Sequence, residues 1–114
     1  ALYQDQKRLP ELFCGFMRRH QRGPVSYPVA CSPQAWAAAA PFAFLAACLG
    51  LEIDHDRNRV RFRNPTLPPF LDGVSIFNLK IGTSRVDLRL QRYGEDVTVN
   101  VLRRTGDAQI SLLK

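Results

Sequence analysis

The apolar residues follow different patterns in the two parts of the chain. Between residues 31 and 51 no side chain carries a full charge, and the apolar residues cover every face of a helix rather than one stripe. Ser32 and Pro33 are suited to open this helix, because a serine oxygen accepts backbone N–H groups and proline fits the first helical position. Gly50 is suited to end it. The pattern predicts a helix that needs protein on all sides.

A membrane-spanning helix is the main alternative for this segment. The run is at the lower limit of length for crossing a bilayer, and most of it is weakly hydrophobic alanine. It also contains Gln34 near its start and Pro41 further on. Pro41 removes a backbone donor and should bend the helix, unless two shorter helices meet there. We therefore expect a buried core helix and no membrane partner.

After residue 50 the apolar positions alternate, as they do in strands. Residues 51–56 lead into a stretch in which arginine takes every second position, so that Val60 and Phe62 face the other side. Two interpretations of the arginine face remain open: a solvated strand surface, or a stripe that binds phosphates. The arginines concerned are Arg57, Arg59, Arg61 and Arg63.

A proline-rich connection, residues 64–73, follows and cannot be a central strand. Residues 74–81 are strand-like, but their apolar positions change phase. Val74 and Ile76 share one face, whereas Phe77 and the alternating apolar residues after it share the other. A β-bulge near Ile76 reconciles the two halves.

The last third of the chain indicates strands with one apolar face. Residues 84–92 alternate cleanly, residues 97–101 continue the pattern, and residues 105–107 form a turn. The inward positions are Val86, Leu88, Leu90, Val97, Val99, Val101, Ile110 and Leu112. We expect an antiparallel sheet whose apolar face packs against another layer.

The length of 114 residues gives room for one domain or for part of a larger one. The chain starts without an initiator methionine, a signal-peptide pattern or a capping residue. We therefore expect a segment cut from a longer protein, with residues 1–9 as the last turns of a helix.

Charge and cysteine content narrow the function classes. The net charge of +6 permits nucleic-acid binding, which would need Arg18, Arg19 and Arg22 to converge with the strand arginines. The three cysteines have no Cys-x-x-Cys spacing and no nearby histidine pair, so neither a disulfide framework nor a metal site is supported. Reduced, buried thiols are expected, which favours a cytoplasmic origin.

Glu11 lies in the middle of an apolar run, residues 9–17. A carboxylate there is unfavourable to bury unless it is hydrogen-bonded, paired or used for chemistry. The simpler interpretation is that Pro10 and Glu11 open a short helix, with the carboxylate near the positive helix end. The residues alone leave both interpretations open.

Two motifs together carry a resemblance to a known family. Residues 8–16 contain Leu-Pro-Glu-Leu, and residues 24–37 contain Pro-Gln-Ala-Trp. Both segments resemble the C-terminal part of the glycogen debranching enzyme and amylo-α-1,6-glucosidase family. Residues 67–88 resemble the short β tail that follows the catalytic barrel in bacterial members. The likeness covers nearly the whole chain.

The resemblance implies an α+β arrangement, with the last helices of an (α/α) barrel at residues 1–50 and a small antiparallel β domain at residues 51–114. It implies that Glu11 is the general base of an inverting glycosidase, that Gln34 and Trp36 contact the sugar, and that no cofactor takes part. Inversion needs a second carboxyl group about 6.5–9.5 Å from the base. That acid is expected upstream, so the fragment alone should be inactive.

The partner implied by the resemblance is an α-glucan oligosaccharide bound by the full-length parent. Because the central helix lacks its neighbours, we expect the isolated chain to expose a large apolar patch and to self-associate. Two other classes remain as alternatives. A noncatalytic carbohydrate-binding or interaction module would need its aromatic residues to line a groove, but most occupy core-like positions: Phe42, Phe44, Phe62, Phe70 and Phe77. A basic nucleic-acid-binding domain is the second alternative.

Overall fold

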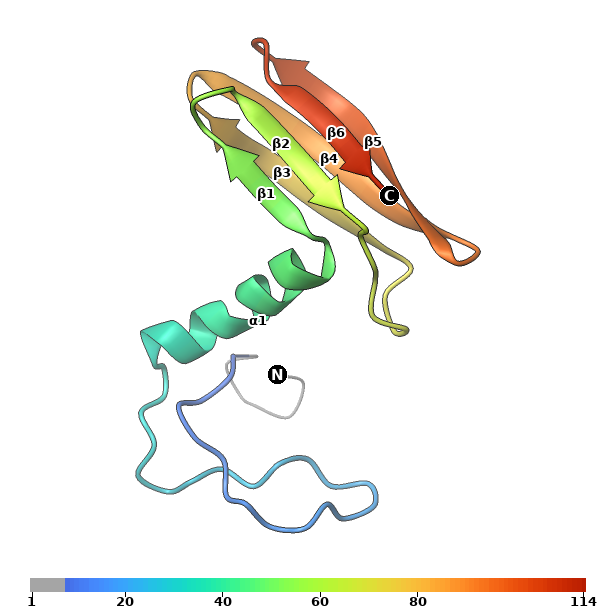
Figure 1. The fold of residues 1–114 in the computed structure, drawn as a ribbon. Helices are drawn as coiled ribbons and strands as arrows, with labels where there is room; N and C mark the ends of the chain where they lie inside the picture. The colour runs from blue at the N-terminus through green and yellow to red at the C-terminus, as the bar shows by residue number, and fades with distance from the viewer. Residues whose placement is uncertain (1–7) are drawn as a thin grey trace. The chain divides into compact units, whose positions relative to one another are not determined.

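The computed structural model describes residues 8–114, which Figure 1 shows as a ribbon. The chain divides into two compact units, Ala1–Phe44 and Leu45–Lys114. The sequence predicts a helix at residues 1–9. Residues 1–7 of it lie outside the described residues, and Arg8 and Leu9 are not helical. Within the described part of the chain, the first unit holds an irregular segment and most of one helix, and the second unit holds the named strands.

The irregular segment, residues 8–34, contains no regular helix or strand. An isolated antiparallel bridge joins Phe13 to Ser26, so two stretches of this segment run in opposite directions. The interpretation that Pro10 and Glu11 open a helix is wrong. Prolines and glycines recur along the segment and disfavour helical backbone. They are Pro10, Gly15, Gly23, Pro24, Pro28 and Pro33.

Helix α1, Ala35–Cys48, is the apolar helix that the sequence predicts. It begins later than expected, because the first helical hydrogen bond runs from the Ala38 N–H to the Gln34 carbonyl. Pro41 lies inside one continuous helix. Only Ala37 is buried, so the expectation of a buried core helix is wrong for the described chain. No helix among the described residues combines the length and hydrophobicity that a bilayer crossing requires.

Gly50 ends the helix as predicted. Its φ angle of +53° lies in the left-handed region that glycine enters most easily, and its N–H donates to the Ala47 carbonyl at 3.1 Å. A side chain is also excluded here for lack of space, because a Cβ atom on Gly50 would overlap the backbone carbonyl of Arg63. In return, the Arg63 N–H donates to the Gly50 carbonyl at 2.9 Å. The helix end is thus tied to a strand of the second unit.

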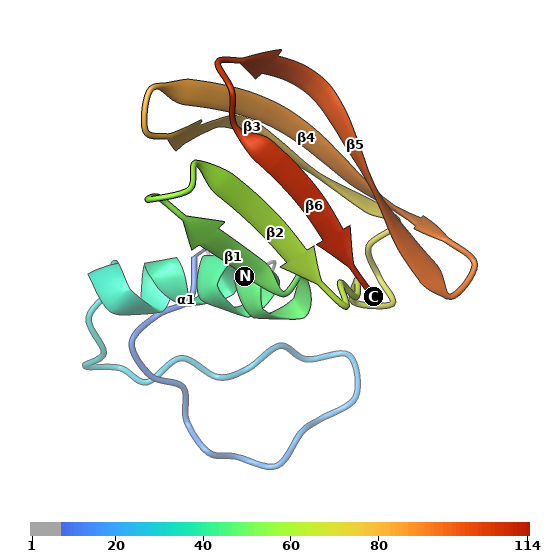
Figure 2. The ribbon, with the colours of Figure 1, turned by 45° about the horizontal axis from the view of Figure 1, so that its top comes forward.

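The second unit contains two three-stranded sheets (Figure 2). One has the order β1-β2-β6 and the other β3-β4-β5. All neighbours are antiparallel except β2 and β6, which are parallel. The strands are β1 Leu51–Asp54, β2 Arg59–Arg63, β3 Gly73–Ile81, β4 Ser84–Tyr93, β5 Asp96–Thr105 and β6 Gln109–Leu113.

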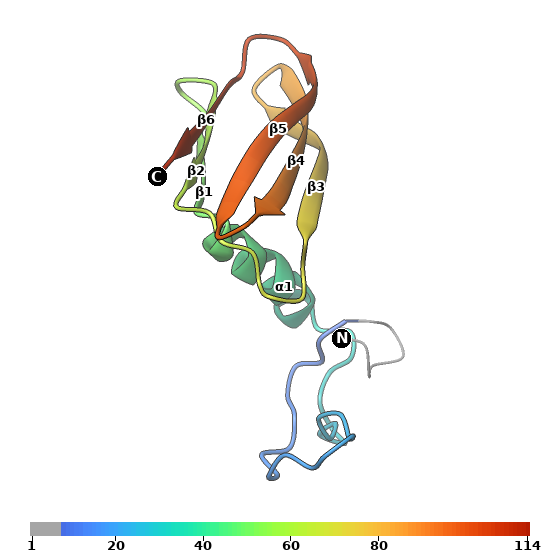
Figure 3. The same cartoon turned by 90° about the vertical axis from the view of Figure 1, so that its right-hand side faces the viewer.

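The apolar faces of the two sheets form one core, and Figure 3 shows the sheets edge-on as two layers. Val60 and Phe62 contribute from β2 and are fully buried, as their alternation with arginine predicts. Val86, Leu88 and Leu90 contribute from β4 and are also buried, as predicted. The layer that covers the predicted apolar sheet face is therefore the other sheet.

The fold expected from the resemblance is wrong. In place of the last helices of an (α/α) barrel and an antiparallel tail, residues 8–114 form one helix and a two-layer β sandwich. Helical layers need several helices, and the described chain has α1 alone, because its other apolar residues alternate as in strands. The parallel pair arises because the connection after Thr105 carries the chain across to the other sheet, where β6 lies beside β2.

Candidate functional site

Glu11 is held against the segment that leads into helix α1. Its backbone N–H donates to the Cys31 carbonyl at 3.2 Å, and its side-chain Oε2 accepts a hydrogen bond from the Cys31 N–H at 3.0 Å. A hydrogen bond from the Cys14 N–H to the Val25 carbonyl, at 2.9 Å, holds the same two stretches together further along. The carboxylate is half-buried and keeps solvent access. The first motif of the resemblance is thus fixed to the start of the second.

The thiol of Cys31 responds to this carboxylate. A hydrogen bond with Glu11 and the negative charge of that group raise the pKa of Cys31 above its ordinary value. The Glu11 carboxylate thus favours the protonated form of the Cys31 thiol. Cys14, Cys31 and Cys48 are all free, but none is buried, so the expectation of buried thiols is wrong. They lie on the irregular segment and on a helix whose surface is largely uncovered.

Gln34 and Trp36 follow Cys31 closely in the sequence, at the start of helix α1. Gln34 is half-buried, and its carbonyl accepts the first hydrogen bond of α1. Trp36 is 60% exposed. An exposed indole ring offers an apolar platform with a polar N–H, as sugar rings require. The structure fixes Glu11 to the backbone next to these residues rather than to their side chains.

Within residues 8–44, no second carboxyl group is present to act with Glu11 in acid–base chemistry. Among residues 8–44, Glu11 is the only acidic residue, and His20 is the only histidine. His20 is exposed on the loop between the two antiparallel stretches. An inverting mechanism built on Glu11 therefore needs a carboxyl group from outside residues 8–44.

Large apolar side chains of α1 are uncovered. Trp36, Phe42 and Phe44 are each at least 60% exposed. A single large apolar patch on the isolated chain stays a prediction, because these exposures concern separate side chains. Self-association through this patch stays a prediction.

The arginine face of β2 is paired with carboxylates of β1. Arg63 contacts Glu52 at 3.0 Å, and Arg61 lies 3.6 Å from Asp54 and 3.9 Å from Glu52. The hydrogen bond from Arg63 holds the pKa of Glu52 below its ordinary value. Hydrogen bonds from the Arg57 N–H and guanidinium do the same for the pKa of Asp54. Carboxylates therefore interrupt the positive stripe that phosphate binding would use, although the arginines outnumber them.

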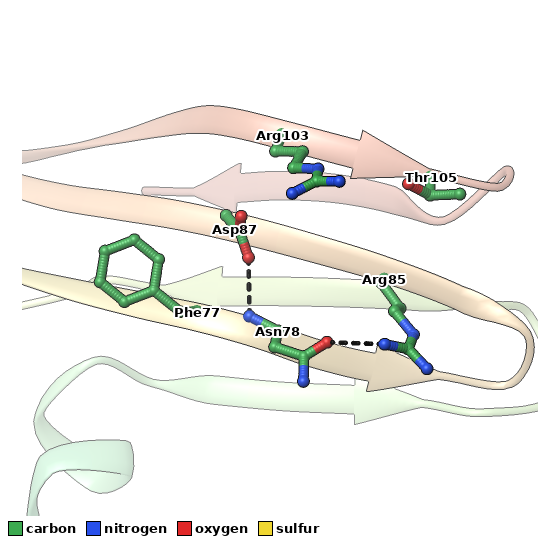
Figure 4. A pocket seen from close by; sticks show the side chains of 6 residues that line it. All are labelled: Phe77, Asn78, Arg85, Asp87, Arg103 and Thr105. Carbon is green, nitrogen blue, oxygen red and sulfur yellow. Dashed lines mark hydrogen bonds between the residues drawn. The ribbon is translucent and has the colours of Figure 1, made fainter.

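The structure also reveals a pocket that the sequence pattern did not indicate. It has a volume of about 340 Å³ and lies on the face of the β3-β4-β5 sheet opposite the core (Figure 4). The predicted bulge in β3 is confirmed, between Ile76 and Leu79, but Phe77 and Asn78 both fall within it. Phe77 consequently points outward and is 67% exposed, so its assignment to the core is wrong. The pocket is lined by Phe77, Asn78, Arg85, Asp87, Arg103 and Thr105.

Of the other phenylalanines predicted at core-like positions, one is buried and three are exposed. Phe62 is fully buried, whereas Phe42, Phe44 and Phe70 are between 65% and 83% exposed. Phe42 and Phe44 lie on α1, and Phe70 lies on the proline-rich connection, where no layer covers them.

Comparisons of the sequence with models of known protein families and with curated proteins, and of the structure with solved structures, gave no match. The functional interpretation therefore depends on the two motifs and on the geometry described above.

Proposed function

We propose that the chain is part of a glycoside hydrolase that acts on α-glucan branches, of the amylo-α-1,6-glucosidase type, with Glu11 as general base. The contact between Glu11 and Cys31 carries this proposal, because it holds the carboxylate of one motif beside the other. A carboxylate that accepts a backbone N–H has a defined orientation, which suits a general base.

The proposed reaction is inverting. Glu11 removes a proton from a water molecule whose oxygen attacks the anomeric carbon, while an acid protonates the departing glycosidic oxygen. The resemblance places that acid upstream of this chain, so the chain alone is expected to be inactive. Trp36 supports the face of a sugar ring, and the Gln34 amide binds its hydroxyl groups. The reaction needs no cofactor, and a reducing cytoplasm suits the three free thiols.

The test is Glu11→Gln in the complete enzyme. The amide oxygen of glutamine still accepts the Cys31 N–H, so the local backbone should be unchanged, but the amide cannot take a proton from water. We expect kcat on a branched α-glucan to fall by about 10²- to 10⁴-fold, the usual contribution of a general base. KM should change little, because ground-state contacts remain.

Glu95→Gln is the matched control. Glu95 is an exposed residue in the β4–β5 turn, outside the first unit, and its replacement should leave kcat unchanged. Circular dichroism of both variants should match that of the parent. A Glu11→Gln enzyme that retains nearly full kcat would remove Glu11 from the mechanism.

A further inference from the structure

Two β-bulges meet at Asp87 in the middle of the β3-β4-β5 sheet. On one side, Phe77 and Asn78 of β3 occupy the interval that Asp87 alone occupies on β4. On the other side, the register with β5 shifts between Asp87 and Leu88, so that Leu102 is the extra residue. Bulges re-aim side chains and occur more often than elsewhere beside functional sites. Two of them at one residue indicate a built feature rather than a regular sheet surface.

Hydrogen bonds fix the polar side chains in this pocket. The Asn78 N–H donates to Asp87 Oδ1 at 2.7 Å, and Arg85 Nη1 donates to Asn78 Oδ1 at 3.3 Å (Figure 4). Asn78 has a φ angle of +56°, a left-handed conformation that non-glycine residues adopt mainly at turns and functional sites. Arg103 lies directly across from Asp87 in the register with β5. The acceptor and its neighbouring donors are thus arranged before any ligand arrives.

The polarity of the pocket selects the chemical class of its ligand. One carboxylate, Asp87, stands among the donor groups of Arg85, Arg103 and Asn78. Neither arginine forms a salt bridge within residues 8–114. A phosphate would be attracted by the arginines but would meet the charge of Asp87, and two anions at contact distance repel each other. A hydroxyl group both donates and accepts, so a pair of adjacent hydroxyls satisfies the carboxylate and the guanidinium groups together.

Phe77 completes the pocket with an apolar surface. Its ring is 67% exposed at the edge of the polar network. A sugar ring has apolar C–H groups on one face and hydroxyl groups around its rim, which matches an exposed aromatic ring beside fixed polar groups. A cavity of about 340 Å³ has room for a short stretch of oligosaccharide rather than for a long chain.

From this geometry we infer that the pocket around Asp87 is a noncatalytic oligosaccharide-binding site, in which Asp87, Arg85 and Arg103 bind adjacent hydroxyls and Phe77 packs on the sugar ring. The class of ligand follows from the pocket alone. The identity of the ligand as an α-glucan rests on the proposed function. In that function, this site would hold a second part of the branched substrate.

The experiment is isothermal titration calorimetry on the 114-residue chain, with maltoheptaose, cellohexaose and inorganic phosphate as separate probes. Phe77→Ala and Asp87→Asn test the pocket. Asparagine keeps an oxygen for the Asn78 N–H, so the bulge should persist. Phe70→Ala is the matched control, because Phe70 is an exposed phenylalanine of the same unit outside the pocket. We expect maltoheptaose to bind, and each pocket variant to weaken its Kd about tenfold while the control does not.

The outcomes separate this site from the catalytic proposal. Binding of cellohexaose in place of maltoheptaose, with the same dependence on Phe77, would support the pocket and contradict the α-glucan assignment. Loss of binding in Glu11→Gln but not in Phe77→Ala would place the sugar at Glu11 and overturn the inference. Failure of both sugars to bind, or binding of phosphate alone, would overturn it as well.

Discussion

The substitution Gly50→Ala tests the turn between the last residues of helix α1 and strand β1, within the second unit. Gly50 has a φ angle of +53°, and a Cβ atom there would overlap the carbonyl of Arg63. A left-handed conformation destabilises a residue with a Cβ by about 1–2 kcal/mol. The overlap involves backbone rather than a flexible side chain, so the chain must shift. We expect that shift to break the hydrogen bond from the Arg63 N–H to the Gly50 carbonyl.

A broken hydrogen bond of this kind adds about 1 kcal/mol to the loss. The two contributions together predict that the unfolding free energy of the second unit falls by about 2–3 kcal/mol. For a domain of this size each kcal/mol lowers Tm by about 4–8 °C, so the predicted decrease is about 8–24 °C. Urea unfolding followed by far-ultraviolet circular dichroism measures the free energy directly. The Trp36 signal is unsuitable, because that residue lies in the first unit.

Gly94→Ala provides the matched control. Gly94 has a φ angle of +60°, but a Cβ atom there meets no atom within 4 Å. Its replacement should therefore lower the unfolding free energy by the conformational contribution alone, about 1–2 kcal/mol. The difference between the two variants isolates the contact with Arg63. Equal losses at both positions would refute the steric argument, and with it the close approach of helix end and strand.

Two further predictions concern titration. The folded chain lowers the pKa values of Glu52 and Asp54 below their ordinary values of 4.5 and 3.8. These carboxylates therefore stabilise the fold fully at a pH above the ordinary values. The stabilisation is lost as the pH falls through the lower folded pKa values. Urea unfolding at a series of acidic pH values should show this loss, with a shallower dependence in Glu52→Gln; parallel curves would contradict the pairing. Glu11→Gln should lower the pKa of Cys31 toward 9.0, shown by the pH dependence of its alkylation in peptide-resolved mass spectrometry, with Cys48 as internal reference. An unchanged Cys31 profile would mean that Glu11 does not contact the thiol in solution.

Strand alternation predicted much of the second unit. Arginine at every second position places Val60 and Phe62 on one face, and the structure buries both. The change of phase near Ile76 predicted a bulge that is present. The parallel pairing of β2 with β6 was not predictable in this way, because alternation specifies which face of a strand is apolar and not which strand lies beside it.

The candidate site was predictable in part. The sequence indicated Glu11 as an unusual carboxylate, but only the fold shows that Cys31, twenty residues away, donates to it. The alternation does not indicate the pocket at Asp87, because Phe77 continues the apolar pattern and is predicted to face inward. The available signal was the asparagine after Phe77, since asparagine tolerates a positive φ angle at bulges and turns.

The pairing of β6 with β2 has a consequence for synthesis on the ribosome. Residues 59–63 emerge long before residues 109–113, yet they form one side of the same parallel ladder. Until the later segment is released, β2 can pair only with β1, and one edge of it stays open to other strands. Contacts between segments so far apart in sequence form slowly. Nascent chains that stall before residue 109 should therefore be the ones that aggregate or recruit a chaperone.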